Sequence, residues 1–416
     1  MAALSPLDPA PIYLDNHATT RLDPRVLEAM LPWLTDHYGN AGSTTHEMGR
    51  EARAAVDAAR EAFAAAIGGT ASEIVFTGGA TESNNLAILG SARRWSALAK
   101  SGAGHVVTTV TEHDAVLDPI DHLERRGVAV TRLPVEPQGA GGVAGRIRLD
   151  GLAAVLRPDT FLVSVMLANN EIGVVQDIPA IAEMVHAHGV LLHVDCAQAV
   201  GRMAVDVAAC GADLASFSAH KFHGPKGVGA LWLRRRGRIV RVEPLVYGGG
   251  QERGMRSGTL DVPGIVGMAE AARLAVAGLP EESARMRELR DRLWRRLRGA
   301  VAGLELNGPL LDDGSPQPVR LVNNLNVRVP GVDGQTLLET LSGAGLAVSS
   351  GSACSSEHPR PSHVLLALGL DEDQARASLR LGLSRFTTAA EIDAAADRIA
   401  AGVARLRALA EPPRPA

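Results

Sequence analysis

Cysteine is scarce in this chain, and so are long apolar runs. The sequence of 416 residues contains Cys196, Cys210 and Cys354, which are too few and too scattered for a disulfide framework or a four-thiolate metal site. No uninterrupted apolar run approaches the roughly 18 residues that a membrane span needs. The first residues also lack the basic and apolar segments of a secretory signal. We therefore expect a cytoplasmic protein that makes no use of a membrane.

A strong excess of charge of either sign is missing as well. The chain has 42 basic and 46 acidic residues and a formal net charge of -4, which argues against a nucleic-acid protein held by bulk electrostatics. Its length is sufficient for a large core and for more than one domain. We expect no direct binding of nucleic acid.

The chain does contain a regular alternation of short apolar runs and longer helical patterns. Several runs are apolar without alternation, as expected for strands that are covered on both faces of a mainly parallel sheet. Between them lie helices such as residues 46–67, in which Val56, Ala59 and Phe63 share one face. The pattern predicts an α/β fold with a large, doubly wound, mainly parallel sheet. Its seven expected strands cover residues 74–76, 105–109, 128–131, 161–167, 190–194, 214–217 and 228–233.

The pattern changes near residues 278–280. A long charged helix follows, with apolar residues spaced for burial on one side. Residues 323–329 then have the character of a strand, and residues 388–391 form a capping-box signature before a last helix. The change in pattern predicts a second, smaller α+β domain. We expect the large domain to cover residues 20–278 and the small domain to cover residues 1–19 and 279–416.

Lys221 and Asp195 form the first chemical signal. A buried-looking run, residues 213–217, leads to Lys221 in a turn, where desolvation lowers the pKa of an amine and favours its nucleophilic form. Such an amine can hold an aldehyde cofactor as a Schiff base. Asp195 ends the preceding strand, where a carboxylate can pair with a protonated pyridine nitrogen. The pair indicates pyridoxal 5'-phosphate (PLP), although a lone lysine in such a turn is more often an ordinary surface residue.

A PLP site also needs a phosphate cup and contacts to the ring. Ala80 and Thr81 lie where the start of a helix would offer free N–H groups to a dianion. Ser218 and His220 flank the lysine and can donate to the same phosphate. Each of these residues taken alone is equally compatible with a turn, a helix cap or a satisfied polar group in the core. The candidates for ring contacts follow strand ends: His113 for stacking, and Asn170 and Gln198 for hydrogen bonds to the phenolic oxygen.

Cys354 and Arg380 are the other residues with a chemical signal. Cys354 lies in a short loop rich in serine, residues 348–356, which predicts an accessible thiol. Arg380 interrupts an apolar run, and an arginine in such a position needs an anionic partner. That partner is either the carboxylate of a substrate or an acidic side chain of the protein, and the sequence favours neither.

A set of motifs resembles those of the cysteine desulfurases, the NifS- and IscS-like class-V relatives of the aminotransferases. The motifs run nearly from end to end of the chain, and together they are specific although each alone is not. The chain departs from the family at His17, where many relatives have alanine or asparagine, and in the loop after Cys354. The motifs occupy residues 13–20, 76–83, 169–173, 193–195, 218–221, 248–259, 349–354 and 385–388.

The resemblance implies the type I fold of the PLP-dependent transferases and a homodimer with active sites at the subunit boundary. Lys221 would hold PLP covalently, and Asp195 would pair with the ring nitrogen. His113 would stack on the ring and carry protons. Thr259 would reach the phosphate in the site of the neighbouring subunit.

The resemblance also implies a reaction. Arg380, with Asn40, would hold the carboxylate of L-cysteine, and Cys354 would take its sulfur as a persulfide, leaving L-alanine. A mobile loop would then bring the persulfide to a sulfur acceptor, such as an iron–sulfur scaffold protein or a component of tRNA thiolation. The length of the loop after Cys354 favours the NifS/IscS-like branch of the family.

Three alternatives remain at the level of sequence. A selenocysteine lyase or a related C–S lyase would share every cofactor residue. A zinc-binding scaffold is suggested by His220 with His223 and by His186 with His188, but no cysteine or carboxylate completes either set, so we expect no metal. A non-catalytic platform for sulfur acceptors would not need Cys354.

Overall fold

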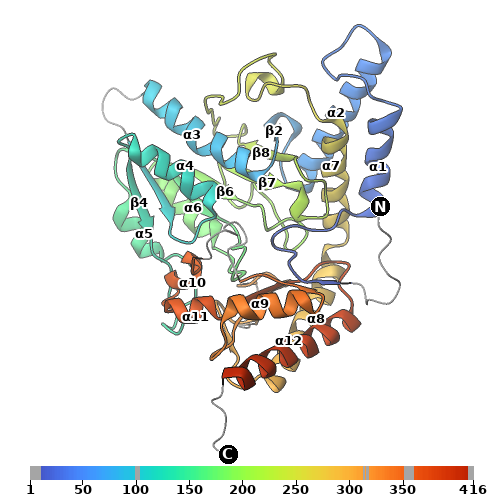
Figure 1. Ribbon diagram of the computed structural model, residues 1–416. Coiled ribbons are helices and arrows are strands. Elements are labelled where there is room, and N and C mark those ends of the chain that lie inside the picture. Colours follow the sequence, from blue (N-terminus) through green and yellow to red (C-terminus); the bar gives the residue numbers. More distant parts are fainter. Residues whose placement is uncertain (1–10, 99–103, 313, 315–317, 351–359, 411–416) are drawn as a thin grey trace, which may run out of the picture.

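The structure is a computed structural model that describes residues 11–98, 104–312, 314, 318–350 and 360–410. Its largest element is a seven-stranded sheet with the strand order β2-β8-β7-β6-β5-β3-β4 (Figure 1). β8 runs antiparallel to both of its neighbours, and the other adjacent pairs are parallel. The predicted α/β fold with a mainly parallel seven-stranded sheet is confirmed. The strands are β2 (Ile74–Thr77), β3 (His105–Thr109), β4 (Ala129–Leu133), β5 (Thr160–Met166), β6 (Leu191–Asp195), β7 (Leu214–Ser218) and β8 (Gly229–Leu233).

Helices cover both faces of this sheet, which explains why its strands are apolar without alternation. Val106 and Leu162, in β3 and β5, pack in the same core cluster as residues of α3 and α4. The residues that follow them, Val107 and Val163, belong to the cluster that contains α2, α6 and α7. The helices are α1 (Pro24–Thr35), α2 (Glu47–Ala66), α3 (Ala80–Leu98), α4 (Asp114–Arg125), α5 (Leu149–Val155), α6 (Ile178–Ala187) and α7 (Val262–Ala277).

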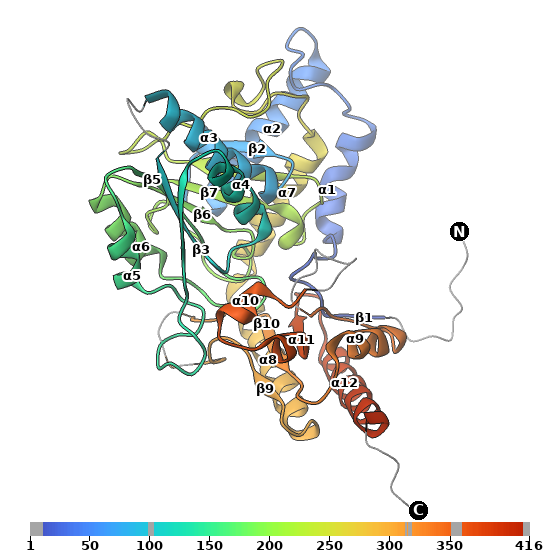
Figure 2. The same cartoon turned by 60° about the vertical axis from the view of Figure 1, so that its left-hand side comes forward.

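A smaller group of elements lies below the large sheet in Figure 2. Its central strand β10 pairs antiparallel with β12 and β9, and β1 pairs in parallel with β11. The long helices α8 and α12 pack against each other beside these strands, around a core of their own. The elements are β1 (Ile12–Tyr13), α8 (Leu279–Ala300), β9 (Glu305–Leu306), β10 (Asn324–Arg328), α9 (Gly334–Gly343), β11 (Leu346–Ala347), β12 (Ser378–Gly382) and α12 (Ala389–Ala410).

Each of the two cores contains residues from separate parts of the sequence. Leu14, near the start of the chain, is buried in the smaller core. Val364 and Leu365, in the short helix α10 (His363–Ala367), pack instead in the large core, which also includes part of α11 (Glu372–Arg376). Separate cores support a division of the chain into two units, and the expected domain boundaries remain a prediction.

Within the described ranges, no single helix is long and apolar enough to cross a membrane. α7 and α8, which meet at a bend of 73°, satisfy the same test of length and composition only when they are taken together. These ranges also contain no group of three or more histidine, cysteine, aspartate or glutamate side chains placed to hold a metal ion.

Candidate active site

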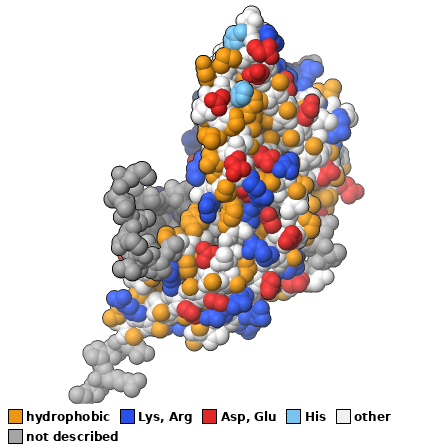
Figure 3. Space-filling view, turned by 90° about the vertical axis from the view of Figure 1, so that its right-hand side faces the viewer, with side chains coloured by type: hydrophobic (Ala, Val, Ile, Leu, Met, Phe, Trp, Pro, Cys, Tyr) orange, Lys and Arg blue, Asp and Glu red, His pale blue; other side chains and the backbone are white. Residues whose placement is uncertain are grey.

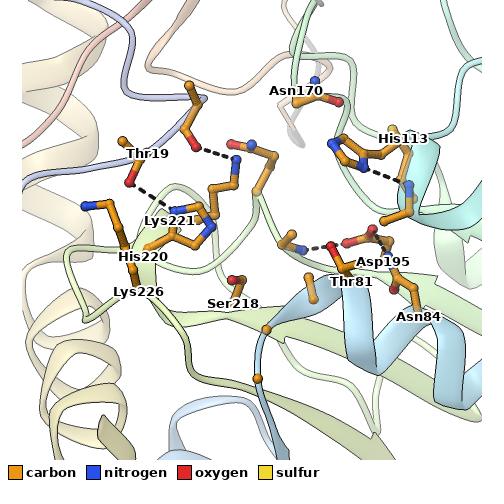
Figure 4. Close-up of a pocket in the computed structure, with 18 of the residues that line it drawn as sticks. Thr19, Thr81, Asn84, His113, Asn170, Asp195, Ser218, His220, Lys221 and Lys226 are labelled. Atoms are coloured by element: carbon orange, nitrogen blue, oxygen red, sulfur yellow. Dashed lines mark hydrogen bonds between the residues drawn. The ribbon is translucent and has the colours of Figure 1, made fainter. Parts of the chain in front are cut away.

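A cavity of about 430 Å³ lies at the carboxyl ends of β5, β6 and β7 (Figure 4). Ligands bind at this edge of open parallel sheets, because the strand ends and the loops after them converge there. The lysines of the chain are Lys100, Lys221 and Lys226, and two of them line the cavity. Its polar lining residues are Thr19, Thr81, Asn84, His113, Asn170, Asp195, Gln198, Ser218, His220, Lys221 and Lys226.

Lys221 reaches the cavity from the turn that follows β7. The strand ends at Ser218, and Ala219–Lys221 form a single 3-10 turn. The side chain is half-buried, and its Nζ donates to the carbonyl oxygen of His17 at 2.6 Å and to that of Ala18 at 2.9 Å. The position of the amine is therefore set by the backbone of a segment far away in the sequence.

That segment, residues 15–20, is held at both of its ends. Asn16 Nδ2 donates to the carbonyl oxygen of Gly382 in β12 at 2.8 Å. The backbone N–H of Thr20 donates to the carbonyl oxygen of His220 at 3.0 Å. Segment 15–20 thus connects the smaller sheet to the turn that carries the lysine.

Asp195 is the last residue of β6, and its side chain is buried at the edge of the cavity. Oδ2 accepts a hydrogen bond from Asn84 Nδ2 at 2.7 Å, and Oδ1 accepts one from the backbone N–H of Ala197 at 2.9 Å (Figure 4). An ionised carboxylate only accepts hydrogen bonds, and both oxygens do so here. The arrangement presents a fixed negative charge to the cavity.

The turn between β2 and α3 lines another part of the cavity with the backbone of Gly78 and Gly79. Gly79 has a φ of 147°, and a Cβ added at Gly229 in β8 would lie 2.6 Å from the Cα of Gly79. Glycine is required where two backbone segments approach so closely. α3 begins at Ala80, and both Ala80 and Thr81 line the cavity. The unpaired N–H groups of a helix start, with its positive dipole end, are suited to an anion.

The two histidines of the cavity are neutral, for different reasons. His113 caps α4, and the backbone N–H of Ala115 donates to its Nδ1 at 3.0 Å, so the proton of the neutral ring is on Nε2. Burial, together with the charge of Lys221, lowers the pKa of His220 to about 4. The Nδ1 of His220 lies 3.0 Å from the hydroxyl oxygen of Thr19.

Gln198 and Asn170, the two amides expected at the ring oxygen, both line the cavity. Gln198 Nε2 donates to the carbonyl oxygen of His17 at 2.9 Å, and its Oε1 lies 3.2 Å from Nδ1 of the His17 ring. Asn170 contributes its backbone carbonyl to Arg380, whose Nη1 donates to it at 3.3 Å. The structure therefore brings together most of the residues that the sequence indicated for a PLP site.

Arg380 is buried in β12 and does not line the cavity. Its Nη2 donates to Oδ1 of Asp15 at 2.8 Å, so an acidic partner for this arginine is present within the protein. The contact with the carbonyl of Asn170 nevertheless places the guanidinium next to the site. Its expected contact with a substrate carboxylate remains a prediction.

Two further expected site residues, Asn40 and Thr259, lie elsewhere. Asn40 and Thr259 are exposed, and neither lines the cavity of this chain. Asn40 Oδ1 accepts a hydrogen bond from the backbone N–H of Gly42 at 2.8 Å. Thr259 is expected in the site of a neighbouring subunit, so its position in a single chain does not test that role. Cys354 lies outside the described residues, and its role remains a prediction.

Some residues of the site carry little or no signal in the sequence. Asn84, which holds Asp195, follows Thr81 by three positions in α3, and this helical spacing could have indicated a shared face. Lys226 lies in the next turn after Lys221 and carries no separate signal. His17 is notable in the sequence only as a departure from the family, without any indication that its ring is buried against Gln198.

Comparison with known proteins agrees with this geometry. Residues 12–395 match the family model of the class-V aminotransferases. Over 401 residues the chain is 48% identical to the cysteine desulfurase IscS of Edwardsiella ictaluri, an alignment that covers 96% of this chain and 94% of the relative.

Solved structures show the same similarity. A NifS-like protein has 39% identity and a TM-score of 0.85, with 95% of this chain and 100% of that chain covered. SspA in complex with cysteine has 35% identity and a TM-score of 0.75, with 90% and 99% covered. This chain therefore belongs to the class-V aminotransferase family and, within it, to the NifS- and IscS-like cysteine desulfurases.

Proposed function

We propose that this protein is a PLP-dependent cysteine desulfurase. It converts L-cysteine to L-alanine, takes the sulfur as a persulfide on Cys354 and passes it to an acceptor protein for iron–sulfur cluster assembly or tRNA thiolation. The observation that carries the proposal is the presence of Lys221 and Asp195 in one cavity with the start of α3. The name of the IscS relative and the bound cysteine of SspA support the choice of substrate.

The residues of the cavity fit PLP. A phosphate dianion suits the backbone N–H groups at Ala80 and Thr81, and the hydroxyl of Ser218 lies in the same lining. The aldehyde requires an amine, which Lys221 supplies, and the pyridine nitrogen requires a carboxylate, which Asp195 supplies. Gly79 adds no side chain of its own to this part of the cavity, where the hydroxyl of Ser218 lies 3.6 Å from the position that a Cβ of Gly79 would take.

The protein contributes orientation and proton transfer. When bound, PLP supplies an electron sink for the bonds of the substrate α-carbon. Nζ of Lys221 and Nε2 of His113 are the atoms that can exchange protons on the substrate side, since Nδ1 of His113 is occupied by the N–H of Ala115. Asp195 keeps its negative charge in place through the bonds from Asn84 and Ala197.

The sulfur step balances without an outside oxidant. The C–S bond of L-cysteine breaks and an S–S bond forms at Sγ of Cys354, for which the thiolate is the attacking species. The carbon that loses sulfur gains a proton and becomes the methyl group of L-alanine. The persulfide sulfur then passes to the thiol of an acceptor.

The experiment compares Cys354→Ser with Cys210→Ser, a half-buried thiol position that serves as the control. Purified wild-type protein with PLP should show a visible absorbance band that changes when L-cysteine is added. We expect Cys354→Ser to keep this band and to lose at least about 100-fold in L-alanine and persulfide formation, because its hydroxyl cannot accept the sulfur. Cys210→Ser should behave as the wild type.

Three results would overturn the proposal. Unchanged sulfur release from L-cysteine by Cys354→Ser would reject the persulfide route. Release of selenide from selenocysteine by that variant, with no turnover of L-cysteine by the wild type, would instead identify a selenocysteine lyase. A wild-type protein that does not bind PLP would remove both possibilities.

We also propose that the active unit is a homodimer. One side of α1 is buried, with Val26 at 0% exposure, while Leu27, Leu31 and Leu34 on its other side are 46%, 52% and 55% exposed. Hydrophobic side chains gather over the upper part of the face shown in Figure 3, the side of the molecule on which α1 lies. A second copy of the chain would cover this face, and exposed Thr259 is then available to the partner's site.

A further inference from the structure

The geometry points to a directional relay of hydrogen bonds that runs from Arg320 through Asn324 and His17 to Gln198 and makes His17 a positioning residue for the ring oxygen of PLP. The inference deepens the proposed function and rests on it, because the contact of Gln198 with that oxygen belongs to the proposal. Arg320 and Asn324 lie four positions apart in one segment, whereas His17 and Gln198 come from two other segments that are distant in the sequence. All four side chains are buried.

The direction of the relay is set at its start. The guanidinium of Arg320 has no acceptor atom, and its Nη1 donates to Oδ1 of Asn324 at 3.1 Å. The oxygen end of the Asn324 amide therefore faces Arg320, and its Nδ2 faces the other way. That nitrogen lies 3.2 Å from Nε2 of His17 and also donates to the carbonyl oxygen of Glu171 at 2.9 Å.

The tautomer of His17 follows from this orientation. An amide nitrogen only donates, so Nε2 of His17 accepts from Asn324 and the ring proton is on Nδ1. Nδ1 then donates to Oε1 of Gln198 at 3.2 Å. Burial and the charge of Arg202 hold the pKa of His17 well below its usual range, so the ring stays neutral.

The far end of the relay is fixed by an independent contact. Gln198 Nε2 donates to the backbone carbonyl oxygen of His17 at 2.9 Å, which requires the amide oxygen to face the ring. One hydrogen of this nitrogen is used in that bond, and the other is available to the cavity that Gln198 lines. Both ends of the relay thus assign the same tautomer to His17.

The relay strengthens its last hydrogen-bond donor, the N–H group of Gln198 Nε2. Hydrogen bonds in a chain polarise one another, and this chain begins at a buried cation. The N–H that Gln198 presents to the cavity is therefore oriented and polarised toward an oxygen with negative charge. In PLP that atom is the phenolic oxygen of the ring.

A substitution at His17 tests the role of its imidazole separately from the role of its backbone carbonyl. Lys221 is held by the carbonyl oxygens of His17 and Ala18, so removal of the imidazole leaves these two acceptors in place. The matched control is His105, another buried histidine, whose ring lies between the hydroxyl groups of Thr160 and Thr131 and outside the cavity. Both His17→Ala and His105→Ala remove a buried, hydrogen-bonded imidazole.

The first measurement concerns the tautomer in the protein without PLP. In ¹⁵N-histidine-labelled protein, the ring signals that disappear in His17→Ala belong to His17. We expect a protonated Nδ1 and an unprotonated Nε2, unchanged between about pH 6 and pH 8. An Nε2–H tautomer or a charged ring would overturn the relay, whatever the enzyme proves to do.

The second measurement is the affinity of the protein for PLP and for an analogue that lacks the ring hydroxyl. We expect His17→Ala to weaken PLP binding about fivefold to tenfold, as for the loss of one hydrogen bond, and to change the affinity for the analogue by less than about twofold. His105→Ala should leave both affinities unchanged.

An equal loss for the two ligands in His17→Ala would show a merely structural role and overturn the inference. Melting curves of both variants without PLP show whether they are folded before affinities are compared. Failure of the wild type to bind PLP would reject the proposed function. The tautomer measurement, which is made without PLP, would still test the hydrogen-bond relay.

Discussion

At the scale of single residues, Glu112 is a buried carboxyl directly before His113. Its Oε1 accepts hydrogen bonds from the hydroxyl of Thr109 at 2.8 Å and from the backbone N–H of Met166 at 2.9 Å. Burial raises its pKa from 4.5 to about 8, and the charge of Asp195 acts in the same direction. The folded protein therefore keeps a proton on Glu112 at neutral pH that the unfolded chain releases.

Replacement of Glu112 by glutamine removes this titration. A raised pKa means that the contribution to stability is complete below about pH 4.5 and is lost as the pH rises toward 8, by at most about 1.4 kcal/mol per pH unit. We expect the free energy of unfolding of Glu112→Gln, relative to the wild type, to increase from pH 5 to pH 8. Urea unfolding near both pH values measures this difference. A difference that does not change with pH would contradict a protonated Glu112.

Residues at strand ends could be predicted from the sequence, and residues that support them could not. Lys221 and Asp195 follow apolar runs, so their place at one edge of the sheet could be inferred from the order of strands and turns alone. Asn84 and His17 act through buried contacts with Asp195 and Gln198 across more than 100 positions of sequence. Pairings of this kind depend on the packing of separate elements, which a local pattern does not contain.

At the scale of elements, β8 packs closely against the turn before α3, on the side of the cavity where we propose that phosphate binds. A Cβ at Gly229 would lie 2.4 Å from the carbonyl oxygen of Phe217 and 2.6 Å from Cα of Gly79. These are backbone atoms, so they can move only if β7 or the turn moves with them. The start of α3 is therefore placed by the sheet itself.

We expect Gly229→Ala to push the turn at Gly79 out of position. PLP affinity should fall by at least about tenfold, and the free energy of unfolding should fall by about 1–3 kcal/mol because the site is overpacked. The control is Gly343→Ala at the end of α9, where an added Cβ meets no atom within 4 Å. Fluorescence titration with PLP and urea unfolding measure the two effects. Wild-type affinity in Gly229→Ala would show that the turn is not held by β8.

The strands of the large sheet were predictable because burial on both faces makes them apolar throughout. The packing of α10 was less accessible from the sequence. Its Val364 and Leu365 lie in the range expected for the small domain, yet they pack in the large core. Ser362 explains part of this placement, because its hydroxyl donates to the buried carboxylate of Glu171, next to Asn170. A helix of five residues is too short for its pattern of apolar residues to predict which core it packs in.

At the scale of the whole molecule, the exposed apolar side of α1 makes the oligomeric state testable. Leu31 is in the middle of this side and is 52% exposed in the single chain. We expect sedimentation of the holoenzyme to give twice the chain mass of 43.5 kDa, and Leu31→Asp to shift the equilibrium toward the single chain because a charge would be buried in the interface. The PLP-bound monomer should also lose activity, since Thr259 would no longer reach a partner's site.

Glu28, an exposed residue of α1, offers the matched control. Glu28→Asp changes an exposed position of the same helix without removing an apolar side chain, and it should sediment as the wild type does. A wild-type protein that sediments as a single chain at micromolar concentration would overturn the homodimer.

The pairing of β1 with β11 has a consequence for how the enzyme is made. Residues 12 and 13 find their partners only at residues 346 and 347, yet the carbonyl groups that hold Lys221 follow β1 within a few positions. During synthesis on the ribosome, the large sheet can form before β11 and β12 are made. Segment 15–20 can then make its contact with His220 before it can make the one with Gly382. The site proposed for the vitamin-derived cofactor is therefore complete only after most of the chain has been translated.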